Sequence, residues 1–484
     1  MTVWPLTTAP YEVQLEALRR SEGKKCFGWY MEQGLGKTGV AYADFIRAFM
    51  EEKCEIMVVV APFYLMSEWE LEAQKQGVKF PVFTWPNDLP RDQKPPFTYV
   101  MNVEAARAGR GFAFLDQLLD KYKAWFGIDE STLIKNFKSL AFTELMKLAQ
   151  KVTIRRELSG LPMPHDVMDL WPQLRFLEQL SGLNPYAFRN RFAVMGGYMH
   201  KQVKGIKNED QLHKIMDECT FRALKIDWAK SLPPKIYKQR LFDMTKAQKE
   251  HYHEMEEDFI TLVDKSNPET AVFADQVIHA MIKLQQISRG FIMDGEKVAQ
   301  ELVPVGKNPA INTLKATLDA TQGKTLIFTQ YRHSTQLLQD VLLDHYKQGV
   351  KDTKPRVKMM MGGMDKEEIR ASKDEFNNDP DVRAFVLQVA VGHRGHTLLG
   401  DVDPKSKNYG PHTLCNNTTF YESNFNYEHR AQGEDRNHRW GAYGDVVTYT
   451  DFICSKMDEK FMASFVKRQS LVDAVLNARR AIPK

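Results

Sequence analysis

Short apolar, β-branched runs alternate with amphipathic stretches along most of the chain. Cys54–Ala61 is one such run, and the helix-like period of Met66–Gln76 follows it. Strands that alternate with helices in this way are typical of a parallel sheet with helices on both faces. The runs expected to form strands are Cys26–Tyr30, Cys54–Ala61, Thr98–Val103, Lys123–Ile128, Val152–Ser159, Lys324–Phe328, Arg356–Met360, Arg383–Val389, Thr418–Tyr421 and Val446–Phe452.

A mostly helical stretch, about 174–290, separates the two groups of strands, with one strand-like piece at Lys235–Phe242. The pattern predicts an α/β protein of two lobes with a helical insertion. We expect the first lobe at 1–175 and the helical segment at 176–300. Residues 235–242 would supply the last strand of the first lobe. The second lobe with a C-terminal helix would occupy 301–484.

Composition places the chain among ordinary globular proteins, with 43% apolar and 26% charged residues in 484. Its most apolar run, Met57–Met66, contains Pro62 and is too short to span a bilayer, so a soluble protein without a membrane partner is expected. The five cysteines form no Cys-x-x-Cys pair, which argues against a zinc site or a disulfide framework. A reducing, cytoplasmic setting fits.

A phosphate loop is predicted where Met31-Glu-Gln-Gly-Leu-Gly-Lys-Thr38 follows a strand and opens a helix. Gly34 and Gly36 would let backbone N–H groups cradle phosphate oxygens. Lys37 would reach the terminal phosphates of ATP, and the Thr38 hydroxyl would ligate Mg²⁺. The strict pattern has Gly or Ala where this chain has Met31, and Gly-Lys-Thr alone also fits a plain helix N-terminus.

A second acidic element ends the strand before Asp129-Glu130-Ser-Thr132. Asp129 would hold Mg²⁺ through water, and Glu130 would orient and deprotonate the water that attacks ATP. The alternative is that the two carboxylates only cap the following helix.

A third element, Tyr427–Trp440, carries Gln432, Arg436 and Arg439. The spacing predicts one helix face from which two guanidiniums stabilise charge on a transferring phosphoryl group. The alternative is a surface helix with pairs such as Glu428–Gln432 and Glu434–His438.

In this order, these motifs resemble the superfamily-two helicases, and most closely the Swi/Snf-type DNA translocases. The resemblance implies two RecA-like lobes and makes Gln14, in Pro10-Tyr-Glu-Val-Gln14, an adenine-reading residue. Further matching segments are Val58–Pro62 with Trp69 and Glu72, Asp129–Asn136, Leu158–Met163 with Asp169, Leu232–Lys235 with Met244–Gln248, Leu326–Tyr331, Met361–Arg370, Leu387–Leu398 and Gln432–Gly441.

Several positions depart from the family pattern. Leu161 replaces a Thr of the coupling motif, His393 and Thr397 replace a Gly and an Asn of the fifth motif, and Thr132 stands where His is common. A polar insertion, Asp401–Thr413, precedes the strand at Thr418. These changes put the coupling of hydrolysis to movement in doubt more than hydrolysis itself.

The resemblance also bears on the partner. Asn184–Arg240 holds twelve Lys or Arg against five Asp or Glu, which alone indicates only a solvated face. In such motors, helical protrusions lie over the duplex, so double-stranded DNA is the expected partner of this segment. Protein partners are unknown, and we expect a monomer. From compactness alone, a phage-infected or bacterial cell is the expected setting.

Three functions stay open on the sequence. The leading one is an ATP-dependent DNA translocase or helicase. An RNA helicase of the same superfamily is the second, against which the Lys135-Asn136 tail argues. A DNA-binding ATPase switch that does not translocate is the third.

Overall fold

The computed structural model describes residues 4–472 except 88, 91, 181, 197–201, 266–270, 297, 348–355, 393–396 and 425. His393 and Gly395 of the predicted fifth motif therefore lie outside the described residues. Contacts within the chain define two units. Unit 1 comprises residues 1–231 with 467–484, and unit 2 comprises 232–466.

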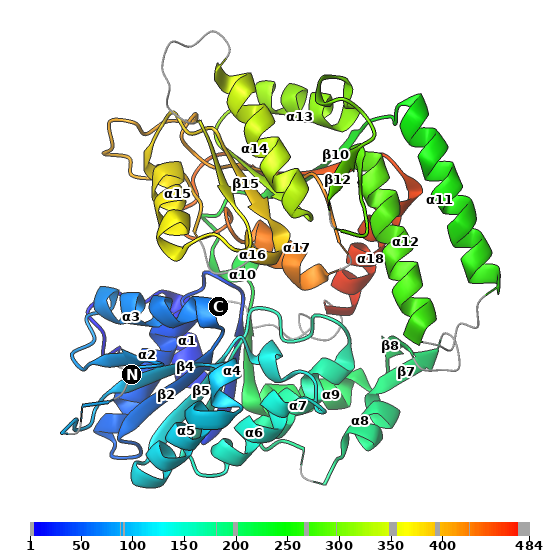
Figure 1. Cartoon of the computed structure of the whole chain (residues 1–484). Coiled ribbons are helices and arrows are strands. Elements are labelled where there is room, and N and C mark those ends of the chain that lie inside the picture. Colours follow the sequence, from blue (N-terminus) through cyan, green and yellow to red (C-terminus); the bar gives the residue numbers. More distant parts are fainter. Residues whose placement is uncertain are drawn as a thin grey trace. The chain divides into compact units, whose positions relative to one another are not determined.

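Unit 1 is built on a seven-stranded parallel sheet in the order β3-β4-β2-β5-β6-β1-β9 (Figure 1). Its strands are β1 (Cys26–Met31), β2 (Ile56–Ala61), β3 (Val82–Thr84), β4 (Thr98–Asn102), β5 (Ala124–Asp129), β6 (Ile154–Leu158) and β9 (Thr220–Ala223). Its helices are α1 (Glu12–Arg20), α2 (Lys37–Met50), α3 (Met66–Lys75), α4 (Val103–Ala106), α5 (Gly109–Lys121), α6 (Leu140–Ala149), α7 (Leu170–Phe176), α8 (Pro185–Phe192), α9 (Glu209–Cys219) and α10 (Lys225–Trp228).

The central strands of this sheet are buried because helices cover both faces, and most of them are apolar; the exception is β6, which buries Arg155, Arg156 and Glu157. Every residue of β1, β2 and β5 is buried. Helix α2 packs between α1 and α3, while α4, α5 and α6 pack together. Continuous burial of this kind is typical of parallel sheets. The carboxyl ends of β1, β6 and β5, which are neighbours in the sheet, consequently share one edge.

Unit 2 has a six-stranded parallel sheet in the order β10-β17-β16-β13-β15-β14. Its strands are β10 (Lys235–Leu241), β13 (Thr325–Thr329), β14 (Val357–Met360), β15 (Ala384–Gln388), β16 (Asn417–Phe420) and β17 (Val447–Ile453). Its helices are α11 (Lys246–Lys265), α12 (Ala271–Arg289), α13 (Pro309–Asp319), α14 (Arg332–Lys347), α15 (Lys366–Asn378), α16 (Val389–Gly392), α17 (Tyr427–Glu434) and α18 (Lys456–Val472), of which the last residues, from Lys467 on, belong to unit 1.

Strand β13 shows how this second sheet is buried on both faces. Ile327 packs into a core with α13 and α14, whereas Leu326 and Phe328 pack into a separate core that includes Phe376 of α15. The alternation follows from the two-residue period of a strand. The two α/β lobes with parallel sheets that the sequence predicts are confirmed.

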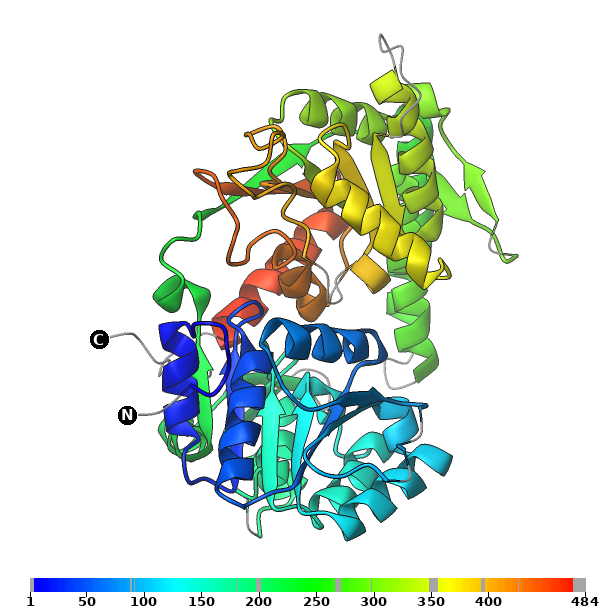
Figure 2. The same ribbon diagram turned by 90° about the vertical axis from the view of Figure 1, so that its left-hand side faces the viewer.

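The ten strands predicted from the sequence are all present, but the strand at Lys235–Phe242 is assigned to the wrong lobe. As β10 it pairs with β17 along its whole length and belongs to the second sheet (Figure 2). The last strand of the first sheet is instead β9, which pairs with β1. The sequence of β10, whose residues are exposed except for the half-buried Lys235, has no periodicity that distinguishes one sheet from the other.

The predicted helical insertion is therefore not one segment. Its first part contains α8, α9 and the hairpin of β7 (Ala193–Gly196) and β8 (Gln202–Ile206), and it belongs to unit 1. Its second part, α11 and α12, belongs to unit 2 and shares a core with α18. The division falls between Ser231 and Leu232, not after residues 175 and 300. Among the helices in the described part of the chain, none is long and apolar enough to cross a bilayer.

Candidate functional site

The predicted phosphate loop connects β1 to α2 at the carboxyl edge of the first sheet. Gly34 and Gly36 have φ angles of 87° and 77°, a left-handed conformation that glycine adopts without strain. Gly36 is the N-cap of α2, and Lys37 is the first residue of that helix. The loop thus presents backbone N–H groups at a helix N-terminus, where anions bind. Met31 departs from the strict pattern without disturbing the loop, because it is the buried last residue of β1.

Lys37 and Thr38 occupy the first turn of α2. The Lys37 ammonium donates to the backbone carbonyls of Met31, at 2.8 Å, and Glu32, at 3.4 Å. The positive charge of Lys37 is therefore positioned beside the start of the phosphate loop. Both side chains are half-buried, so they border the loop without being sealed from solvent.

Gln14, in the first turn of α1, lies against the phosphate loop. Its amide N–H donates to the Gly36 carbonyl at 3.1 Å, and its amide oxygen accepts from the Tyr11 N–H at 2.8 Å. A Cβ at Gly36 would approach the Gln14 nitrogen to 2.3 Å, so a larger residue there would displace the Gln14 amide from the loop. Gln14 is thus placed beside the nucleotide loop, and its reading of adenine stays a prediction.

Asp129 and Glu130 lie at the carboxyl end of β5. Asp129 is 7% exposed, and its carboxylate accepts from the Trp69 indole N–H and from the Glu130 backbone N–H, both at 3.0 Å. Burial raises the pKa of the Asp129 carboxyl above its ordinary value, while the Lys37 ammonium and these two N–H groups oppose the rise. The Asp129 carboxylate is thereby held, largely buried, at the carboxyl end of β5.

Glu130 has φ = 52°, which is unusual for a residue with a Cβ. It precedes a short 3-10 helix, Ser131–Ile134, but its side chain does not cap that helix. The interpretation of the acidic pair as a simple helix cap is therefore wrong. The Glu130 carboxylate instead accepts a hydrogen bond from Gln33 of the phosphate loop at 3.4 Å, in a strained conformation of a kind found at functional sites.

The residues present fit a magnesium ion that is shared with a nucleotide. Thr38 supplies a hydroxyl and Asp129 a buried carboxylate, both of which are oxygen donors. Within the described residues, no group of three or more His, Cys, Asp or Glu side chains is arranged to hold a metal by itself. Phosphate oxygens and water would have to complete the shell, as is usual for Mg²⁺ in phosphoryl-transfer sites.

Two positioning residues complete the site, and the sequence alone assigns neither role. Trp69 of α3 holds Asp129, and its own backbone carbonyl accepts from the Tyr42 hydroxyl of α2 at 2.9 Å. In the sequence, Trp69 stands out only as part of a motif. Gln173 of α7 gives no signal there, because a lone glutamine in an apolar helix has no distinctive pattern.

Gln173 links the acidic element to the predicted coupling motif. Its amide oxygen accepts from the Ser131 hydroxyl at 2.6 Å, and its amide N–H groups donate to the carbonyls of Pro162 and Asp169, both at 2.7 Å. Gln173 is fully buried. The residue that follows Glu130 is thus connected to the loop that contains Leu161.

In unit 2, the predicted arginine element is not one helix. Helix α17 ends at Glu434, and Arg436 and Arg439 follow it in turns, so the prediction of a shared helix face is wrong. Arg436 is fully buried and donates from Nε to the Gln432 carbonyl at 2.8 Å. Arg439 donates to the Thr397 hydroxyl at 2.9 Å. Thr397, a departure from the family pattern, therefore contacts a predicted functional arginine.

The alternative of a solvated surface helix explains only part of this region. Gln432 does donate to Glu428, at 3.2 Å, as that alternative expects. Glu434, in contrast, is buried and accepts from Arg430 at 2.8 Å, from Lys235 at 3.0 Å and from the Tyr237 hydroxyl at 2.8 Å. Burial alone would raise the pKa of Glu434, yet Lys235 and Arg430 lower it below its ordinary value.

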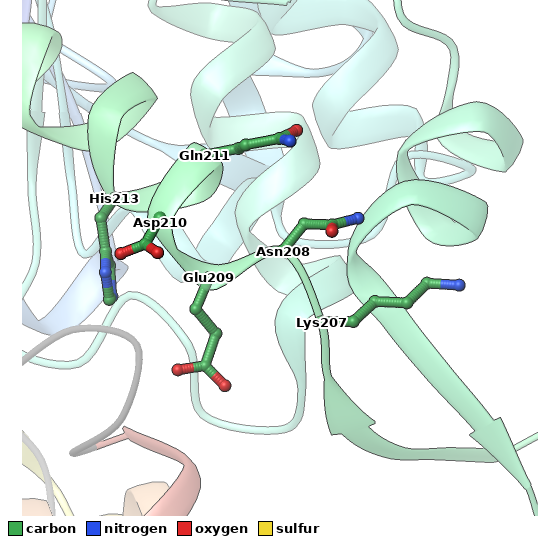
Figure 3. Close-up of a pocket in the computed structure, with 6 residues that line it drawn as sticks. All are labelled: Lys207, Asn208, Glu209, Asp210, Gln211 and His213. Carbon is green, nitrogen blue, oxygen red and sulfur yellow. The ribbon is translucent and has the colours of Figure 1, made fainter.

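The basic segment Asn184–Arg240 is not one surface either, since it is divided between the two units. A hollow of about 420 Å³ lies in its first part, at the start of α9 (Figure 3). Acidic side chains in a first helical turn are favoured by the helix dipole, and Glu209 and Asp210 take those places. Because the hollow carries both charge signs, it does not match a groove for phosphates. Its lining residues are Lys207, Asn208, Glu209, Asp210, Gln211 and His213.

Comparison with known proteins decides the family. The model of the SNF2-related domain matches residues 30–290, which is more than half of the chain and includes the phosphate loop, Asp129 and Glu130. The chain belongs to the SNF2-related family. The predicted resemblance to Swi/Snf-type ATPases is thereby confirmed.

Individual relatives are distant. The SWI/SNF chromatin-remodeling complex subunit snf22 of Schizosaccharomyces pombe is 24% identical over 86% of this chain and 24% of its own length. The DNA annealing helicase and endonuclease ZRANB3 of Mus musculus is 23% identical over 93% of this chain and 39% of its own. The chain thus spans about a quarter to two fifths of these curated relatives. A solved Sulfolobus solfataricus SWI2/SNF2 ATPase core in complex with dsDNA is 20% identical, covers 98% of both chains and has a TM-score of 0.41.

The Trp69–Asp129 hydrogen bond predicts a specific defect in Trp69→Phe. The variant keeps an aromatic ring but loses the N–H that stabilises the ionised carboxylate. Loss of such a supporting bond weakens metal binding by roughly 10- to 100-fold. We expect the Mg²⁺ concentration for half-maximal ATP hydrolysis to rise accordingly in a magnesium titration.

Trp125→Phe is the matched control, because the Trp125 indole donates to the buried Asp44 carboxylate at 2.9 Å outside the site. Its stability should fall similarly while its magnesium dependence stays that of the wild type. Equal magnesium curves for both variants would contradict the role of Trp69.

Glu434→Gln is expected to lower the free energy of unfolding by roughly 1–3 kcal/mol, because the half-buried Lys235 loses its carboxylate partner and the buried Arg430 keeps only Asp451. The folded-state pKa of Glu434 is lowered, so the stabilisation is present above the ordinary glutamate pKa and is lost as pH falls through the folded value. Urea unfolding at neutral and acidic pH measures this. The exposed Glu459→Gln serves as the control, and a pH-independent difference would argue against the ion pairs.

Proposed function

We propose that the chain is an ATP-dependent DNA translocase that hydrolyses ATP at the carboxyl edge of the first sheet. The observation that carries the proposal is the placement of the phosphate loop and the Asp129–Glu130 pair on strands β1 and β5 of one parallel sheet, in a member of the SNF2-related family. Carboxyl ends of parallel strands form binding crevices in open α/β sheets. The phosphate loop and the acidic pair thus lie at the same edge of the sheet.

Each residue of this site has a distinct task in hydrolysis. Backbone N–H groups of the loop and the Lys37 ammonium bind the phosphates and neutralise charge on the terminal one. Glu130, held by Gln33, orients the attacking water and accepts its proton. Thr38 and Asp129 would hold Mg²⁺, which would supply neutralisation of phosphate charge when bound.

The second unit is proposed to complete the reaction. Arg436 and Arg439 would stabilise charge on the phosphoryl group in the transition state, with Gln432 beside them. The carbonyl and hydroxyl contacts of these side chains within unit 2 fix their positions before any nucleotide contact. Hydrolysis would then depend on a defined arrangement of the two units.

Double-stranded DNA is the proposed partner. The names of the relatives refer to chromatin remodeling and to DNA annealing, and this chain carries basic residues on α8 and the adjoining hairpin. Tyr186 is exposed with the Arg189 guanidinium 5.5 Å from its ring centre, whereas Phe188 is buried. Arg189 and Tyr186 therefore offer charge and an aromatic face to a nucleic acid, while Phe188 belongs to the core. A monomeric state and a cytoplasmic setting stay predictions.

A substrate panel tests the proposal. We expect duplex DNA to stimulate ATP hydrolysis more than single-stranded DNA or RNA does. The protein should also displace the third strand of a DNA triplex in an ATP-dependent manner. Stimulation by RNA alone would favour the RNA helicase, and DNA-stimulated hydrolysis without triplex displacement would favour a switch that does not translocate.

Glu130→Gln is expected to lower kcat by roughly 10²- to 10⁴-fold, because an amide cannot accept the proton of the attacking water. ATP affinity should change little, as Lys37 and the loop are intact. A fluorescent nucleotide titration and a phosphate-release assay measure the two quantities. The exposed Glu22→Gln is the control, and a Glu130→Gln variant with normal kcat would rule out this residue as the base.

Arg436→Ala is expected to lower kcat by about 10³-fold, the smallest effect typical of an arginine that stabilises phosphoryl transfer. Because Arg436 is fully buried, thermal unfolding must first show that the variant is folded. Nucleotide affinity should be retained, since unit 1 binds the phosphates. A folded variant with wild-type kcat would remove Arg436 from the mechanism.

A further inference from the structure

Strand β10 forms the edge of the second sheet, and its outer side is unpaired among the described residues. The Pro234 carbonyl accepts from Val447 of β17 at 2.9 Å, and the Phe242 N–H donates to Ile453 at 3.2 Å. Backbone groups of successive strand residues alternate between the two sides. The residues that point N–H and C=O away from β17 are therefore Lys235, Tyr237, Gln239 and Leu241.

This edge is held firmly from within unit 2. All seven residues of β10 are in register with β17. The Tyr237 ring stacks on Tyr449 with 5.4 Å between ring centres, and Lys235 and the Tyr237 hydroxyl both bind Glu434. A strand that is already ordered loses little conformational entropy when another strand is added to it.

The edge exposes apolar side chains as well as backbone. Leu241 is 73% exposed, Tyr237 57% and Ile236 39%. Long edge strands with exposed apolar residues are ready templates for pairing with another chain. The outward backbone groups recur every second residue, which is the spacing that an extended peptide matches.

The basic charge of β10 distinguishes among the partners that could bind to its outer edge. The charged residues of β10 are all basic: Lys235, which is neutralised by Glu434, and Lys238 and Arg240, which share the other face of the strand. A second copy of β10 would bring these like charges together, which is destabilising. A DNA duplex would bind Lys238 and Arg240 but would leave the backbone edge and Leu241 without a partner.

We propose that β10 is a docking site for an extended, acidic segment of a partner protein, which adds to the sheet as a further strand. The outward N–H and C=O groups from Lys235 to Leu241 supply the hydrogen bonds, as in β-strand addition. Carboxylates two residues apart on the partner face Lys238 and Arg240. This docking site is independent of ATP hydrolysis and of the proposed translocase activity.

Peptide binding to the full chain tests the proposal without nucleotide. The probe is a short fluorescein-labelled peptide of alternating Glu and Val, followed by fluorescence polarisation. Gln239→Pro removes one outward N–H and leaves the ladder to β17 intact, because proline is tolerated on the free side of an edge strand. A variant with Lys238→Glu and Arg240→Glu removes the charge attraction. Each variant should weaken binding by at least about tenfold.

The controls separate strand addition from attraction by net charge and from unfolding of the variants. Lys307→Glu with Lys347→Glu makes the same change of net charge on exposed residues away from β10 and should bind the probe as the wild type does; Lys347 ends α14, which packs on β14 at the opposite edge of the sheet. Amide exchange at Tyr237 and Gln239 should slow when the peptide binds. Circular dichroism confirms that each variant is folded.

Three results would overturn the proposal. The first is no binding of the probe to the wild type, and the second is equal binding to Gln239→Pro, which would mean attraction by charge alone. The third is a loss of duplex DNA binding in the Lys238→Glu, Arg240→Glu variant that matches its loss of peptide binding, which would assign the strand to nucleic acid. None of these results depends on whether the protein translocates.

Discussion

The burial of the Asp129 carboxylate is the constraint on which the nucleotide site depends. A buried carboxylate is costly unless it is hydrogen-bonded or paired with charge. Here the Trp69 indole, the Glu130 backbone and the nearby Lys37 ammonium provide that compensation. Each of these three groups comes from a different segment. The contacts of the Asp129 carboxylate therefore hold α3, the end of β5 and the phosphate loop in place relative to one another.

Hydrogen bonds also connect the acidic pair to helices α2, α3 and α7. Trp69 lies on α3 and is bonded through its carbonyl to Tyr42 of the phosphate-loop helix. Gln173 of α7 hydrogen-bonds both to Ser131, which follows Glu130, and to Pro162 in the loop that follows β6. A displacement of α3 or of α7 would therefore move a direct hydrogen-bond partner of Asp129 or of the residue next to Glu130.

The sequence predicted most of the first sheet and the composition of its site, because both follow from local pattern. Buried parallel strands give continuous apolar runs, and a phosphate loop has a short, specific sequence motif. Features that depend on distant pairing could not be predicted. Strand β10 has the composition of an exposed strand, and only its partner β17 assigns it to the second sheet. Gln173 likewise has meaning only through three contacts from separate segments.

The arginine element shows where local periodicity is a poor guide. The spacing of Gln432, Arg436 and Arg439 fits one helix face, but α17 ends at Glu434, where ion pairs with Arg430 and Lys235 hold its last turn. The arginines are instead positioned by individual hydrogen bonds to Gln432 and Thr397. Individual hydrogen bonds, one local for Arg436 and one long-range for Arg439, and not helix periodicity, determine where these two charges lie in unit 2.

The central proposal is that Arg436 and Arg439 of unit 2 act on ATP bound at the phosphate loop of unit 1, and a distance measurement between the units tests it most directly. Spin labels at Lys75→Cys of unit 1 and Arg370→Cys of unit 2, both on exposed side chains, would report the distance, because four of the five native cysteines are buried. The claim predicts a shorter and narrower distance distribution when a non-hydrolysable ATP analogue and duplex DNA are both bound. An unchanged distribution in a protein whose ATP hydrolysis is stimulated by that DNA would contradict it.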